Sequence, residues 1–163
     1  DSSTSRGLGD VYKRQVRYPR GSGISKKVNK NLGDIKLGKS KTLFSGKKIV
    51  ILAFGPILNT CIDVANDLNA TLVDMRFIKP IDETAIIKLA KTHKLIVTVE
   101  DNTIHGGAGS AVLEILSKNK IVIPTLTLGI PDKFVNHGSQ DEIYKECGLD
   151  KNSIKKKIVM NFN

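Results

Sequence analysis

Aromatic residues, cysteine and long apolar runs are all scarce in this sequence. Phe, Trp and Tyr together make up 5% of the 163 residues, and Trp is absent. The longest apolar run, residues 49–54 (IVILAF), is far shorter than the ~20 residues of a transmembrane helix. The first fifteen residues also lack the apolar stretch of a signal peptide. The two cysteines, Cys61 and Cys147, form no C-x-x-C pattern, which indicates a reduced, cytoplasmic setting.

Positive charge is confined to the first part of the chain. Residues 1–48 contain thirteen Lys and Arg against three Asp and Glu, a net charge of +10, whereas residues 49–163 contain thirteen of each. A basic segment can follow nucleic-acid phosphates, but no aromatic residues are interleaved to stack on bases. We therefore interpret the segment as a solvated, Lys-rich linker and predict no nucleic-acid binding.

The beginning of the chain, residues 1–15 (DSSTSRGLGDVYKRQ), has no apolar periodicity. It resembles a translated adapter scar, and we expect it to be a non-native leader. On this interpretation the native sequence starts at Val16, which favours a fragment of a longer protein.

The rest of the sequence alternates between strand and helix patterns. The continuous apolar run 49–54 is typical of a strand buried on both faces of a parallel sheet. We expect Pro56 in the first turn of the next helix, and Asp82 and Ser139 as helix caps. The predicted strands are 41–44, 49–54, 70–77, 94–100 and 124–130, and the predicted helices are 56–68, 82–93, 110–119, 139–149 and 151–162. This alternation predicts a three-layer α/β/α sandwich with a mostly parallel sheet.

Polar residues follow several predicted strands, at the edge where α/β sheets place their functional groups. Asp74 and Arg76 share parity on their strand, so we expect an ion pair or a contact to another chain. The turn "HGGAGS" before the helix 110–119 favours a close approach of the backbone rather than nucleotide binding, because Val112 stands where G-x-G-x-x-G needs its last glycine. His105 at this turn either faces a site or is a surface residue. No metal-ligand or catalytic-triad pattern occurs.

Four stretches resemble one enzyme family, 1-deoxy-D-xylulose-5-phosphate synthase, in its C-terminal, transketolase-C-like domain. They are "RYPRG" (17–21), "VDMRFIKPID" (73–82), "VTVEDNTIHGGAGSAVLEIL" (97–116) and "GIPDKFVNHGSQDEIYKECGLD" (129–150). The second stretch also resembles transketolases and 2-oxoacid dehydrogenase β subunits, whereas the combination with the first and last is more specific. The resemblance implies that residues 41–163 form the C-terminal domain. It also implies that residues 16–40 are the linker and the end of the preceding pyrimidine-binding domain.

The resemblance also implies a cytoplasmic homodimeric transferase that uses thiamine diphosphate and Mg²⁺. Family members decarboxylate pyruvate and join its remaining carbons to glyceraldehyde 3-phosphate, for isoprenoid and thiamine biosynthesis through the methylerythritol phosphate pathway. The groups that bind the cofactor and the metal belong to upstream domains. We therefore expect this chain alone to bind neither of them and to be inactive.

The resemblance assigns one site residue to this chain, Arg20 of "YPRG", as a ligand of the substrate phosphate. A planar guanidinium matches phosphate oxygens, and Pro19 and Gly21 would fix and turn the chain on either side. Without the resemblance, Arg20 is a linker residue in water. Two alternatives stay open: the C domain of a transketolase or 2-oxoacid dehydrogenase β subunit, and a free-standing α/β binding module. A third, a nucleic-acid binder that uses the basic segment, is disfavoured by the neutral charge of residues 49–163.

Overall fold

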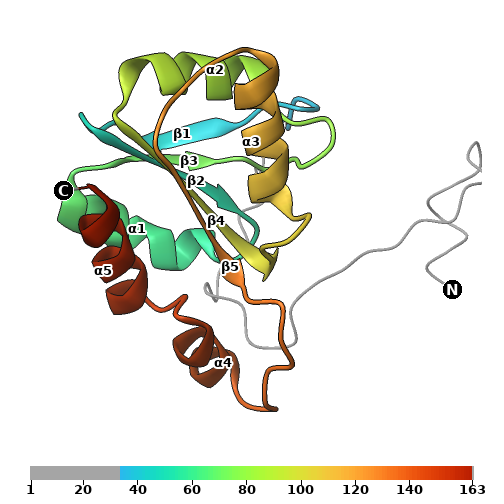
Figure 1. Cartoon of the computed structure of the whole chain (residues 1–163), viewed down its shortest axis with the longest axis vertical. Coiled ribbons are helices and arrows are strands. Elements are labelled where there is room, and N and C mark those ends of the chain that lie inside the picture. Colours follow the sequence, from blue (N-terminus) through green and yellow to red (C-terminus); the bar gives the residue numbers. More distant parts are fainter. Residues whose placement is uncertain (1–33, 163) are drawn as a thin grey trace, which may run out of the picture. The chain divides into compact units, whose positions relative to one another are not determined.

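The computed structural model describes residues 34–162, and residues from Ile35 onward belong to one unit. Strands and helices alternate along this unit, and helices cover both faces of a central sheet (Figure 1). The strands are β1 (Lys41–Phe44), β2 (Ile49–Phe54), β3 (Thr71–Asp74), β4 (Leu95–Thr103) and β5 (Thr125–Ile130). The helices are α1 (Leu58–Leu68), α2 (Glu83–Thr92), α3 (Ala108–Lys118), α4 (Gln140–Cys147) and α5 (Lys151–Phe162).

The sheet has five strands in the order β1-β3-β2-β4-β5. Strands β3, β2, β4 and β5 run parallel, and only β1 is antiparallel, pairing with the edge of β3. Although β1 and β2 are consecutive, they are not neighbours, because β3 lies between them. The predicted three-layer α/β/α sandwich with a mostly parallel sheet is confirmed.

Each face of the sheet has its own apolar core. Alternate residues of β2 point to opposite faces, so Ile51 joins the core beneath α1 and α5, whereas Leu52 joins the core beneath α2 and α3. Every residue of β2 is buried, which explains why its sequence is apolar throughout rather than alternating.

The two predicted N-caps are confirmed. The Asp82 carboxylate accepts the N–H group of Ala85 at 3.2 Å at the start of α2. Ser139 and Glu142 form a reciprocal capping box at the start of α4. Each such cap stabilises its helix by about 1 kcal/mol.

Some element boundaries differ from their predictions. Helix α1 begins at Leu58, two residues after Pro56, so the prediction that Pro56 lies in the first helical turn is wrong. Pro56 instead belongs to the preceding turn, in which its carbonyl accepts the N–H group of Asn59. Strand β3 ends at Asp74 rather than at residue 77, and β4 continues to Thr103.

No helix within residues 34–162 is long and apolar enough to cross a membrane.

Candidate functional site

Parallel strands end at the same edge of a sheet, where α/β domains gather their functional groups. In this chain the carboxyl edge carries Gly55 after β2, Asp74 at the end of β3, and Glu100 near the end of β4. The loop 131–139 follows β5 at the same edge. These strand ends define the candidate site.

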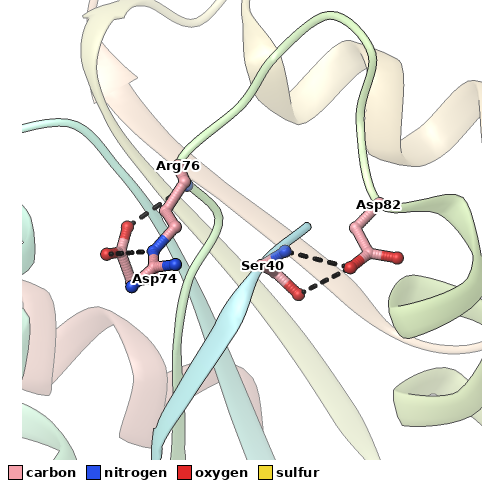
Figure 2. Close-up of polar contacts among 4 residues, drawn as sticks. All are labelled: Ser40, Asp74, Arg76 and Asp82. Atoms are coloured by element: carbon pink, nitrogen blue, oxygen red, sulfur yellow. Dashed lines mark hydrogen bonds and ion pairs between the residues drawn. The ribbon is translucent and has the colours of Figure 1, made fainter. Parts of the chain in front are cut away.

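The Asp74 carboxylate binds Arg76, which lies two residues further along the chain. One carboxylate oxygen accepts the Arg76 backbone N–H group at 3.2 Å, and the other accepts the guanidinium Nε–H at 3.4 Å (Figure 2). Arg76 has a left-handed backbone with φ of 58°, which is strained for a residue with a side chain. The predicted ion pair is confirmed, but strand parity is not its cause, because the strand has already ended and the turn brings the two side chains together.

The Asp74 contact uses one guanidinium N–H group of Arg76, and no residue within 34–162 binds the others. An arginine has five such donors, and the Nε–H is the one that Asp74 accepts. The Arg76 side chain is 28% exposed, and no second carboxylate among the described residues forms an ion pair with it. A guanidinium fixed in this way suits a phosphate or carboxylate group.

A second carboxylate, Asp82, fixes the far end of the same loop. Its Oδ2 atom accepts the Ser40 backbone N–H at 3.0 Å and the Ser40 hydroxyl at 3.1 Å (Figure 2). Burial alone would raise the pKa of Asp82, but the hydrogen bonds from Ser40 and Ala85 and the charge of Lys39 hold it below its ordinary value. Asp82 therefore ties the segment before β1 to the start of α2 as an ionised group.

The glycine-rich turn before α3 is filled from within the protein. Glu100, which is 2% exposed, accepts the N–H group of Ala108 at 2.8 Å and that of Gly109 at 2.9 Å. These are the free N–H groups that a helix N-terminus would otherwise present to an anion. The two N–H groups are therefore not available to an anion from outside the protein.

The glycines of this turn allow α3 to pack closely on β4, as predicted. A Cβ atom on Gly107 would collide with the Glu100 carboxylate and the Thr103 carbonyl. A Cβ atom on Gly109 would lie 2.7 Å from the Thr98 hydroxyl. No larger residue fits at either position without moving β4 or α3.

Of the two site residues proposed from sequence, His105 lies within the described structure. His105 is 78% exposed on the turn before α3, with Nδ1 3.7 Å from the Asp132 carboxylate. Arg20 lies outside the described residues. Sequence reasoning did not foresee that Glu100 caps α3 or that Ser40 contacts Asp82, because both pairs depend on the packing of distant segments.

The described residues do not fit a thiamine diphosphate and Mg²⁺ site. No group of three or more His, Cys, Asp and Glu side chains in this part of the chain could hold a metal ion. The glycine turn is not open to a diphosphate, because Glu100 occupies its N–H groups. We derive no catalytic step through the cofactor from these residues.

The fold and the edge residues define a three-layer α/β domain with polar groups at the carboxyl ends of a parallel sheet. The chain belongs to a family of such domains: residues 38–154 match the transketolase C-terminal domain family. A solved structure, a split-gene transketolase described as an inactive β4 tetramer, superposes with a TM-score of 0.72 at 28% identity. The match covers 78% of this chain and 43% of that one.

Several curated relatives of the chain are named 1-deoxy-D-xylulose-5-phosphate synthase. The chain is 47% identical over 143 residues to the protein of Vibrio parahaemolyticus and 50% identical over 143 residues to that of Aeromonas hydrophila. It is 47% identical over 148 residues to the protein of Psychromonas ingrahamii. These matches cover 88–91% of this chain but 23–24% of each relative. The resemblance found in the sequence is confirmed, and the chain spans about a quarter of the relatives it matches.

Proposed function

We propose that this chain is the C-terminal part of a thiamine-diphosphate-dependent 1-deoxy-D-xylulose-5-phosphate synthase. The parent enzyme would convert pyruvate and glyceraldehyde 3-phosphate to 1-deoxy-D-xylulose 5-phosphate and CO₂ in the cytoplasm. One observation carries the proposal: 47% identity over 143 residues to a synthase of which the chain covers 23%. The lower identity of 28% to a transketolase chain favours the synthase over the transketolase alternative.

In this proposal, residues 41–163 are the C-terminal domain, residues 16–40 are the linker and the end of the preceding domain, and residues 1–15 are a non-native leader. The upstream domains of the parent supply the binding sites for thiamine diphosphate and Mg²⁺. The isolated chain is therefore catalytically inactive, and it supports the active-site domains in a homodimer.

We further propose that Arg20 binds the phosphate of glyceraldehyde 3-phosphate. Within the described residues, Arg76 is a separate candidate for anion binding, since Asp74 accepts its Nε–H and no described residue binds its outer N–H groups. Its strained backbone supports a functional role, because strain of this kind collects at binding sites. His105 contacts an exposed carboxylate, Asp132, rather than a buried group, so we assign it no catalytic role.

The first experiment is to read the source DNA upstream of the codon for Val16 and to express the continuous reading frame. The purified parent, supplied with thiamine diphosphate and Mg²⁺, is expected to form 1-deoxy-D-xylulose 5-phosphate. The variant R20A is expected to raise KM for glyceraldehyde 3-phosphate more than KM for pyruvate. A start codon in place of an upstream domain, or CO₂ release from pyruvate by the pure isolated chain, would overturn the proposal.

A further inference from the structure

A cavity of about 280 Å³ lies at the opposite edge of the sheet from the candidate site. It opens where β2 begins and where α1 and α5 end, so it belongs to the amino edge of the parallel strands. None of the residues discussed for the synthase contributes to it. Its lining residues are Lys47, Lys48, Ile49, Leu68, Asn69, Val159 and Phe162.

The inner wall of the cavity is apolar and continuous with a protein core. Ile49 belongs to the core between the sheet and helices α1 and α5, and Leu68 and Phe162 pack against that core. Val159, on α5, remains 42% exposed. An apolar group that entered the cavity would extend this core and remove more apolar surface from water, at about 25 cal/mol per Å².

The mouth of the cavity is positively charged. Two of its lining residues are lysines, and none is Asp or Glu. No ion pair found within residues 34–162 includes Lys47 or Lys48. The acidic residues of the adjacent helix α1, Asp63 and Asp67, are instead engaged by Lys151 and Lys155 of α5. Uncompensated lysines beside an apolar wall attract an anion.

The backbone on which the two lysines stand is rigidly held. Gly46 packs directly on Asn69 and Ala70, and a Cβ atom there would collide with the Asn69 carbonyl. The Gly46 N–H group is bound by the Thr71 hydroxyl at 2.8 Å. The Lys48 carbonyl accepts the N–H groups of Lys94 at 2.7 Å and of Leu95 at 3.3 Å. The cavity is therefore built into the junction of the β1–β2 turn with α1 and β4.

We propose that this cavity binds a small amphipathic anion, with its apolar tail against Ile49, Leu68 and Phe162 and its charged head at Lys47 and Lys48. The cavity of about 280 Å³ is much larger than the ~10–15 Å³ that a single water molecule requires. This volume can hold a carboxylate with a medium-length apolar tail, such as octanoate. The proposal is independent of the synthase assignment, because it uses neither the residues at the carboxyl edge of the sheet nor the cofactor.

The test is an NMR titration of the full chain with octanoate, held below its micelle concentration. Acetate, with the same head and no tail, and 1-octanol, with the same tail and no charge, serve as comparison ligands. Octanoate is expected to cause saturable shifts in the amides of Ile49, Leu68 and Phe162, and to bind more tightly than either comparison ligand. Equal binding of 1-octanol, or shifts that map to another face, would overturn the proposal.

Two sets of variants test where the charged head and the apolar tail of octanoate bind in the cavity. The double variant K47A/K48A is expected to weaken octanoate binding by about fivefold, whereas K133A, at the carboxyl edge, leaves it unchanged. The variant V159W is expected to fill the cavity and abolish binding while the chain still unfolds cooperatively. Unchanged affinity in K47A/K48A contradicts the proposal even if V159W fails to fold. Binding to anionic vesicles without binding to octanoate would also contradict it, in favour of a lipid surface.

Discussion

The carboxylate of Glu100 accepts the backbone N–H of Ala108 at 2.8 Å, across a helix–strand interface that is almost completely buried. Its second oxygen accepts the N–H group of Gly109 at 2.9 Å. A side chain from β4 therefore caps α3 from inside the core. The buried charge is compensated by two hydrogen bonds and by the positive end of the helix dipole.

This arrangement predicts that the conservative variant E100Q is destabilised. An amide side chain offers one oxygen and one NH₂ group, so one of the two N–H groups of α3 would face a donor. A buried donor without a partner costs about 1–3 kcal/mol, and urea denaturation would measure this loss of unfolding free energy. The control is E114Q, an exposed position on the same helix. Equal stability of the two variants would show that Glu100 does not cap α3.

The contacts of Asp82 predict that the wild type and the variant D82N differ in stability by an amount that depends on pH. Its pKa is lowered in the folded protein, so its ionised form stabilises the fold at neutral pH. This contribution is complete above the ordinary Asp pKa of about 3.9 and is lost as the pH falls through the lower folded value. We expect D82N to be less stable than the wild type by about 1 kcal/mol at pH 7, and the difference to shrink below pH of about 4.

Denaturation at a series of pH values measures this difference. The variant D63N is a suitable control, because the Asp63 side chain is 65% exposed and lies 3.8 Å from its lysine partner. Surface pairs of this kind contribute little. If D82N remains less stable than the wild type by the same amount at the lowest pH values measured, the charge of Asp82 is not what stabilises the segment at Ser40.

The backbone conformation of Arg76 predicts that glycine at this position gives a more stable protein than alanine does. Its φ of 58° strains any residue that has a side chain, by about 1–2 kcal/mol. Both R76A and R76G lose the Asp74 ion pair, but R76G alone relieves the strain. We therefore expect R76G to be more stable than R76A by about 1 kcal/mol, measured by chemical denaturation. Equal stabilities would remove the argument that Arg76 is retained for function in spite of its backbone.

The parts of the fold that follow from local sequence were predictable, and the parts that depend on packing were not. The apolar run 49–54 identified a strand buried on both faces, and Asp82 and Ser139 identified helix starts, because each signal lies within a few residues. The place of β3 between β1 and β2 depends on contacts between segments far apart in the chain. The early end of β3 depends on a left-handed residue, Arg76, which no periodicity in the sequence reveals.

The same distinction applies to the candidate site. The pairing of Asp74 with Arg76 was predictable, because the two residues are neighbours in sequence. The capping role of Glu100 was not, although its two signals were present: a carboxylate near a strand end and a glycine-rich helix start eight residues later. The register between β4 and α3 decides whether these two features meet.

His93 connects α2 to the start of β3 through a hydrogen-bonded chain. Its Nδ1 lies 2.9 Å from the Leu89 carbonyl, and its Nε2 lies 2.8 Å from the Thr71 hydroxyl. A carbonyl oxygen only accepts, so the hydrogen of the neutral ring is on Nδ1, and Nε2 accepts from Thr71. Thr71 in turn accepts the Gly46 N–H at 2.8 Å.

The chain of bonds predicts an Nδ1–H tautomer for neutral His93 and a specific effect of T71V. Valine keeps the shape of threonine but leaves Gly46 N–H and His93 Nε2 without a partner, at a cost of about 1–3 kcal/mol in unfolding free energy. The exposed control T84V, on α2, is expected to cost little. Nitrogen-15 spectra of the imidazole measure the tautomer directly. An Nε2–H tautomer would reverse the direction of the Thr71 bond, since the hydroxyl would then accept from His93 rather than donate to it.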